Sequence, residues 1–181
     1  MKDMVRLIAT LTLICAVCSS LLAFVSKITE EPIRQSETLR KLDAAKKVML
    51  PACDGLVEKT YETNFVYYVG SIDGKPKAYA LEGASQNGYG GTVRLMVGFG
   101  ADLKLTNFEV IEAKETPGLG MKMTTEEFRS PMRGLAAETT EWRVKKDGGQ
   151  IAEITAATIS SRAVMECIRD AIAKLKLVCQ P

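Results

Sequence analysis

FVYYVGSI (65–72), KAYALE (77–82), TVRLMVGF (92–99) and LKLTNFEVI (103–111) are four short runs that fill the middle of this 181-residue chain. Together they are rich in β-branched and aromatic residues, which favour extended backbone. Turn-forming residues separate them at Asp73-Gly74, Gly88–Gly91 and Gly100–Asp102. Because such short turns join neighbouring antiparallel strands, the runs predict an antiparallel sheet.

The end of the chain has a helical period instead. Apolar residues recur at helical spacing at Ala163, Val164, Cys167, Ile168, Ala171, Ile172 and Leu175. Ser160 or Ser161 can cap this helix with a side-chain hydroxyl, and residues 150–154 before it are interpreted as a strand. An amphipathic helix packed on an antiparallel sheet is an α+β fold, which we expect to occupy residues 51–181 as one domain.

The beginning of the chain carries an uncharged apolar run, LIATLTLICAVCSSLLAFV (Leu7–Val25), after a tail of residues 1–6. As a helix it would span about 28 Å, close to the hydrocarbon core of a bilayer. We predict a retained transmembrane helix. The alternative is a cleaved signal peptide, but no A-x-A site follows the run, and Val17 is a poor residue before a lipobox cysteine. Basic residues flank the run on both sides, so they do not decide its orientation.

A second helix is expected to connect this span to the domain, over residues 26–50. Glu30-Glu31-Pro32 is typical of a helix start. Acidic side chains favour the positive end of a helix dipole, and proline is tolerated in the first turn. Pro51 would then mark the beginning of the domain.

The composition excludes several classes of function. Histidine is absent, which rules out serine triads and Cys–His dyads and removes the usual haem and mixed zinc ligand. Lys and Arg total 24 against 22 for Asp and Glu, so no broad basic surface is available for nucleic acid. Five cysteines form an odd set, and a disulfide among Cys53, Cys167 and Cys179 stays open. We predict neither a metal site nor a catalytic group.

Two segments could bind a ligand. ETPGLG (115–120) is a rigid, glycine-punctuated loop after a strand, whose backbone could approach a flat ligand closely. TAATISS (155–161) leads into the last helix, where free amide groups and the helix dipole can hold a phosphate beside a hydroxyl group. Taken alone, the first segment is an ordinary turn and the second an ordinary cap. No GxGxxG or P-loop spacing is present.

Taken together, ETPGLG, GYGG (88–91) and ITAATISSRAV (154–164) behind one N-terminal span resemble the RnfG family, found in ion-translocating ferredoxin:NAD⁺ oxidoreductases. In that family an S/T-G-A-T sequence carries FMN through a phosphoester on its last threonine. The matching residue here is Thr158, whereas Ala156 replaces the family's glycine. The resemblance further implies that FMN is bordered by Glu115, Thr116, Pro117, Gly118 and Leu119 and, near the phosphate, by Thr155, Ala157, Ser160 and Ser161.

The resemblance also implies a role. The chain would relay electrons through its covalent FMN to and from other membrane and peripheral subunits of the Rnf complex, without turning over a substrate alone. A separate flavin transferase would attach FMN taken from FAD. The chain would contact membrane lipid as a single-pass protein of a prokaryotic cell membrane, with its domain on the extracytoplasmic side.

Three alternatives remain at the level of sequence. The NqrC subunit of sodium-pumping quinone reductases shares the FMN-binding domain but is a longer chain. A pilin-like subunit would also combine a long apolar helix with an antiparallel sheet, although no glycine cleavage site precedes the apolar run here. A membrane-anchored binding or assembly module without a cofactor would use both motifs only as a turn and a cap.

Overall fold

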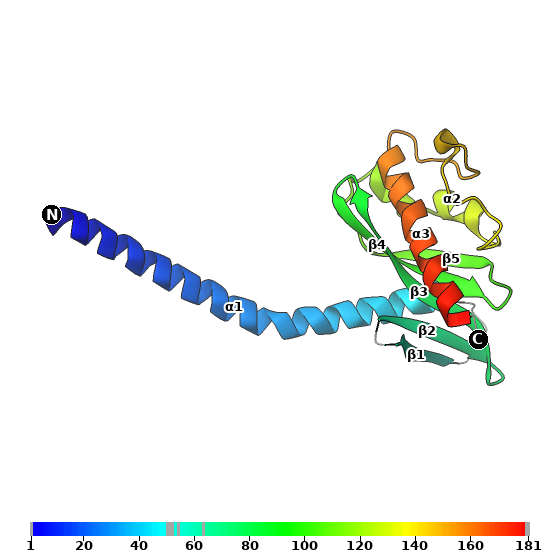
Figure 1. Ribbon diagram of the computed structural model, residues 1–181, viewed down its shortest axis with the longest axis horizontal. Helices are drawn as coiled ribbons and strands as arrows, with labels where there is room; N and C mark the ends of the chain where they lie inside the picture. The colour runs from blue at the N-terminus through cyan, green and yellow to red at the C-terminus, as the bar shows by residue number, and fades with distance from the viewer. Residues whose placement is uncertain (1, 50–52, 54, 63, 180–181) are drawn as a thin grey trace. The chain divides into compact units, whose positions relative to one another are not determined.

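The computed structural model describes residues 2–49, 53, 55–62 and 64–179 (Figure 1). The elements follow in the order α1 (Lys2–Val48), β1 (Gly55–Tyr61), β2 (Phe65–Ile72), β3 (Lys75–Gly88), β4 (Gly91–Gly100), β5 (Leu105–Glu112), η1 (Gly120–Thr124), α2 (Glu126–Arg129), η2 (Ser130–Met132), η3 (Lys145–Asp147) and α3 (Thr158–Cys179). The predicted α+β class, with an apolar N-terminal helix, an antiparallel sheet and a C-terminal helix, is confirmed.

The five strands form one antiparallel sheet in the order β1-β2-β3-β4-β5. β2 has the bounds that the sequence predicts, and β3 is longer at both ends than the predicted run at 77–82. β1 was not predicted from the sequence. Most of its residues are exposed, so its sequence lacks the alternation that marks a half-buried strand.

α1 runs from Lys2 to Val48 without interruption, so the helix start expected at Glu30-Glu31-Pro32 is wrong. Proline removes one backbone hydrogen bond from a helix but does not have to end it. Here Glu31 accepts hydrogen bonds from Arg34 and Gln35 one turn later, which supports the helix next to Pro32. The apolar N-terminal part of α1 is exposed and is long enough to cross a membrane.

The chain divides into two compact units, residues 1–40 and residues 41–181. The last turns of α1 belong to the second unit. There Ala44, Ala45 and Val48 pack in one cluster with buried residues on one face of the sheet, and the Thr106 hydroxyl donates to the Val48 carbonyl at 2.5 Å. The second unit therefore includes the end of α1 in its core.

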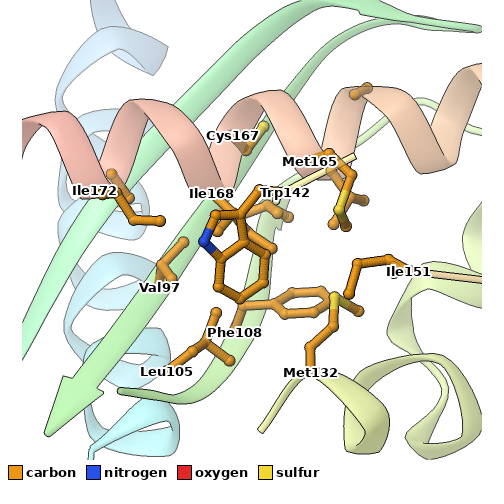
Figure 2. Packing of buried hydrophobic residues seen from close by; sticks show 14 of the residues in the cluster. Val97, Leu105, Phe108, Met132, Trp142, Ile151, Met165, Cys167, Ile168 and Ile172 are labelled. Carbon is orange, nitrogen blue, oxygen red and sulfur yellow. The ribbon is translucent and has the colours of Figure 1, made fainter. Parts of the chain in front are cut away.

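The main core lies on the other face, where α3 packs against β3 and β4 (Figure 1). Figure 2 shows Trp142 and Phe108 at its centre, with Ile168 of α3 nearby. The Trp142 indole N–H donates to the Ala137 carbonyl at 3.0 Å, so this buried polar group is satisfied. Burial raises the pKa of the Cys167 thiol to about 12, which makes Cys167 a packing residue rather than a nucleophile.

Candidate functional site

The three sequence motifs meet at one buried carboxylate, that of Glu115. The Ser160 hydroxyl on α3 donates to Glu115 Oε2 at 2.7 Å. The Gly90 N–H, in the turn between β3 and β4, points at Glu115 Oε1 at 3.4 Å. Both Glu115 and Ser160 are buried. Residues far apart in the sequence are therefore held together by one side chain from the middle motif.

Glycine is required at two positions where these segments touch. A Cβ atom on Gly90 would overlap the Lys114 carbonyl oxygen, which is backbone and cannot move aside. A Cβ atom on Gly120 would overlap the Glu115 carboxylate and the Ser160 hydroxyl. The glycines of GYGG and ETPGLG thus permit close contact between these segments of the protein, whereas the predicted approach of the ETPGLG backbone to a flat ligand stays a prediction.

A surface cavity of about 540 Å³ opens where the motifs meet, and it is lined by Tyr89, Glu115, Thr116, Leu119, Gly120, Ala156, Ala157, Thr158, Ile159 and Ser160. Three of these side chains leave apolar surface in solvent: Tyr89 is 71% exposed, Ile159 47% and Leu119 40%. Exposed apolar groups gathered around one cavity indicate a binding site for a partly apolar ligand.

α3 begins at Thr158, two residues earlier than the sequence suggested. Ser160 and Ser161 are therefore inside the first turn and do not cap it. The Ser161 hydroxyl donates to the Ala157 carbonyl at 3.0 Å and accepts the Ile154 N–H at 2.9 Å. The predicted strand at 150–154 is also wrong, because only Ile151 makes an isolated bridge, to Val144.

The turn before α3 places Ala156 in an unfavourable backbone conformation. Its φ of 62° is in the left-handed region, which glycine adopts most easily. The Ala157 N–H donates to the Ile154 carbonyl at 2.9 Å and closes the turn. This geometry gives a physical reason for a glycine at the position that Ala156 occupies.

The four hydroxyl groups of 155–161 have different surroundings. Ser160 and Ser161 are buried and engaged in the hydrogen bonds described above. Thr155 is exposed and lines a separate cavity of about 200 Å³ next to Glu153 and Phe128. Thr158 is half-buried and lines the cavity at which the motifs meet.

The predicted loop residues divide in a similar way. Glu115, Thr116 and Leu119 line the cavity, whereas Pro117 and Gly118 form the outer part of the turn and are not among its lining residues. The Thr116 carbonyl accepts the Leu119 and Met121 N–H groups, each at 3.2 Å, which closes this turn.

A cation beside Thr158 was not predicted from the sequence. Lys146, in the 3-10 turn η3, donates from Nζ to Thr158 Oγ1 at 3.2 Å and lies 3.9 Å from Glu153 Oε1. Tyr89 and Ile159 were also not predicted as cavity residues. Ile159 could have been found from its place next to Thr158, but nothing in the sequence around Lys146 relates it to a residue twelve positions later.

Comparison with known proteins defines the class first. The family described as FMN-binding domain matches residues 88–173, a range that includes all three motifs. The G subunit of the ion-translocating oxidoreductase complex of Methanosarcina acetivorans is 31% identical over 94% of this chain and 94% of its own length. The protein of the same name from Shewanella baltica is 28% identical over 90% of this chain and 84% of its own length.

This chain belongs to the family of G subunits of ion-translocating oxidoreductase complexes. Among solved structures, the C subunit of a Na⁺-translocating NADH-quinone reductase from Parabacteroides distasonis is similar over 65% of this chain and 64% of that one. The TM-score is 0.49, with 18% sequence identity.

Proposed function

We propose that this chain is an electron-transfer subunit of an ion-translocating ferredoxin:NAD⁺ oxidoreductase and carries FMN as a phosphoester on Thr158. The family membership supports the role in an oxidoreductase complex, and the FMN-binding domain supports the cofactor. The site described above supports the position of attachment.

One observation carries the assignment of Thr158. Among the hydroxyl groups of residues 155–161, that of Thr158 lines the cavity and is not used as a donor to a buried acceptor. The Ser160 hydroxyl donates to Glu115, and the Ser161 hydroxyl donates to the Ala157 carbonyl. Lys146 donates to Thr158 Oγ1, which leaves the hydroxyl proton free to depart. Thr155 is not among the residues that line this cavity.

The residues fit the two ends of FMN. The exposed apolar surface of Tyr89, Leu119 and Ile159 suits the flat isoalloxazine ring. The first turn of α3 has amide groups without intrahelical acceptors and the positive end of a helix dipole, which suit a phosphate. When bound, FMN supplies the redox chemistry, while the chain orients the cofactor and holds it at the surface of the domain.

The anchor and the partners follow from the same proposal. The apolar part of α1 would hold the domain at a prokaryotic membrane, on the extracytoplasmic side, next to the other subunits of the complex. Attachment of FMN would be catalysed by a separate flavin transferase that transfers FMN from FAD to the Thr158 oxygen, breaking the phosphoanhydride bond and releasing AMP and the hydroxyl proton. Exposure of the cavity at the protein surface suits a relay, because electrons must pass to and from cofactors of neighbouring subunits.

The test is co-expression of the full chain with a flavin transferase, followed by intact mass and in-gel flavin fluorescence under denaturing conditions. Wild type should gain the mass of one FMN adduct, and Thr158→Ala should lose both mass and fluorescence. Thr155→Ala, which removes an exposed hydroxyl from the same segment, is the matched control and should keep the adduct. An FMN adduct on Thr158→Ala would show that another residue is the acceptor.

A further inference from the structure

An ion pair between two neighbouring residues holds Lys146 in position beside the first turn of α3. Arg162, four residues after Thr158 and so on the same side of α3, donates from Nε and Nη2 to the two Asp147 oxygens at 2.8 and 2.6 Å. These bonds hold the pKa of Asp147 below its usual value. Because Asp147 is the last residue of η3, the bidentate pair fixes the short turn that carries Lys146.

The ammonium of Lys146 has only weak partners among the residues that the structure describes. Its bond to Thr158 is to a neutral hydroxyl, and the 3.9 Å separation from Glu153 is at the outer limit of an ion pair. The side chain is 61% exposed, so the Glu153 pair contributes little to stability. The Lys146 ammonium is held beside the cavity with only a distant carboxylate as counter-charge, so an anion that binds there would give it a close partner.

The anion can be placed by the residues around it. Lys146 already contacts Thr158 Oγ1, so a phosphate bonded to this oxygen would lie next to the Lys146 ammonium. We propose that Lys146 binds the phosphate of FMN and positions it at the Thr158 hydroxyl, with Arg162 and Asp147 as positioning residues. This inference rests on the proposed function, because it takes FMN as the ligand of the cavity.

The experiment measures non-covalent binding, which removes the flavin transferase from the test. The full chain, produced without a transferase and kept in detergent, is titrated with FMN and with riboflavin, which has the same ring and no phosphate. Wild type should bind FMN more tightly than riboflavin. Lys146→Met should weaken FMN binding about tenfold, the loss expected for one partly exposed charge-assisted hydrogen bond, and leave riboflavin binding unchanged.

Two matched variants separate position from net charge. Lys145→Met removes the neighbouring exposed cation and should leave both affinities unchanged, and Lys146→Arg should retain most of the FMN preference. The proposal is overturned if wild type binds the two flavins equally, or if Lys146→Met keeps the preference. It is also overturned if Lys145→Met loses as much FMN affinity as Lys146→Met does. The same holds if Lys146→Arg loses as much FMN affinity as Lys146→Met. The adduct on Thr158 is scored separately by mass, so failure of the proposed function would be recognised independently.

Discussion

The two faces of the sheet are packed by different means. On the α3 face, large side chains such as Phe99, Phe108 and Trp142 fill the space between the sheet, α3 and the segments that lead to the site. On the α1 face, Ala78 and Ala80 meet the alanines at the end of α1. There the backbones approach so closely that a Cβ atom on Gly98 would overlap the Val48 carbonyl.

The difference shows which face maintains the site. Ile151, Ile154 and Ala157, which precede Thr158, are buried in the α3-face core, so the position of the cavity depends on that packing. The α1 face instead secures the end of the anchor helix through a separate, smaller cluster and through charge. Lys41 at the end of α1 and Arg94 on β4 both pair with Glu82, at 2.9 and 2.5 Å. Changes on the two faces should therefore have separable effects.

The largest expected effect comes from removing a large side chain on the α3 face. Phe108 is fully buried, and Phe108→Ala should lower the free energy of unfolding by about 3–5 kcal/mol through lost burial and the cavity left behind. It should also reduce the proposed FMN adduct, because the core beneath 151–157 loosens. Urea denaturation and intact mass measure the two effects.

The matched change on the other face is Met96→Ala. Met96 is also buried, but it packs against the end of α1, so we expect a loss of about 2 kcal/mol, the lower end for such substitutions, with the FMN adduct retained. Equal loss of the adduct in both variants would mean that the two faces do not differ in how they maintain the site.

The next effect concerns charge on the α1 face. Burial alone would raise the pKa of Glu82, but hydrogen bonds and charge from Lys41 and Arg94 outweigh it and hold the pKa below its ordinary value of 4.5. The carboxylate therefore stabilises the fold at neutral pH, and this stability is lost as the pH falls below about 4.5 through the folded pKa.

Glu82→Gln should cost about 2 kcal/mol at pH 7, because two cations lose a partly buried partner. The difference between wild type and variant should shrink as the pH is lowered to about 3, as measured by denaturation at each pH. Gln cannot titrate, so a difference that stays constant over this range would show that the Glu82 charge is not responsible.

The sequence predicted the elements that have a clear burial pattern and missed those that do not. β2 to β5 were found because their apolar residues and the turns between them are local signals. β1 has no such signal, since it is an exposed strand at the edge of the sheet. The helix start at 30–32 was wrongly inferred because local capping residues cannot show that α1 already exists on their N-terminal side.

The residues that line the cavity were predictable where they are contiguous in the sequence. ETPGLG and TAATISS were predicted to bind a ligand, and the structure brings residues of both segments to one cavity. The capping role predicted for Ser160 and Ser161 was wrong because their partners, Glu115 and Ile154, depend on tertiary structure. Lys146 was missed for the same reason, since a turn pinned by Arg162 brings it to Thr158.

The smallest expected effect tests the turn at the α3-face site. Ala156 has a φ of 62°, and a Cβ atom costs about 1–2 kcal/mol in this region, whereas glycine has no such penalty. Glycine also loses more conformational freedom on folding, which offsets about 0.5–1 kcal/mol of the gain. Ala156→Gly should therefore raise the free energy of unfolding by up to about 1.5 kcal/mol, and it should speed the proposed FMN attachment by relaxing the turn before Thr158. Ala152→Gly, at an exposed residue without positive φ, should instead destabilise the protein slightly. If denaturation shows the same loss for both glycine variants, the left-handed conformation of Ala156 carries no strain.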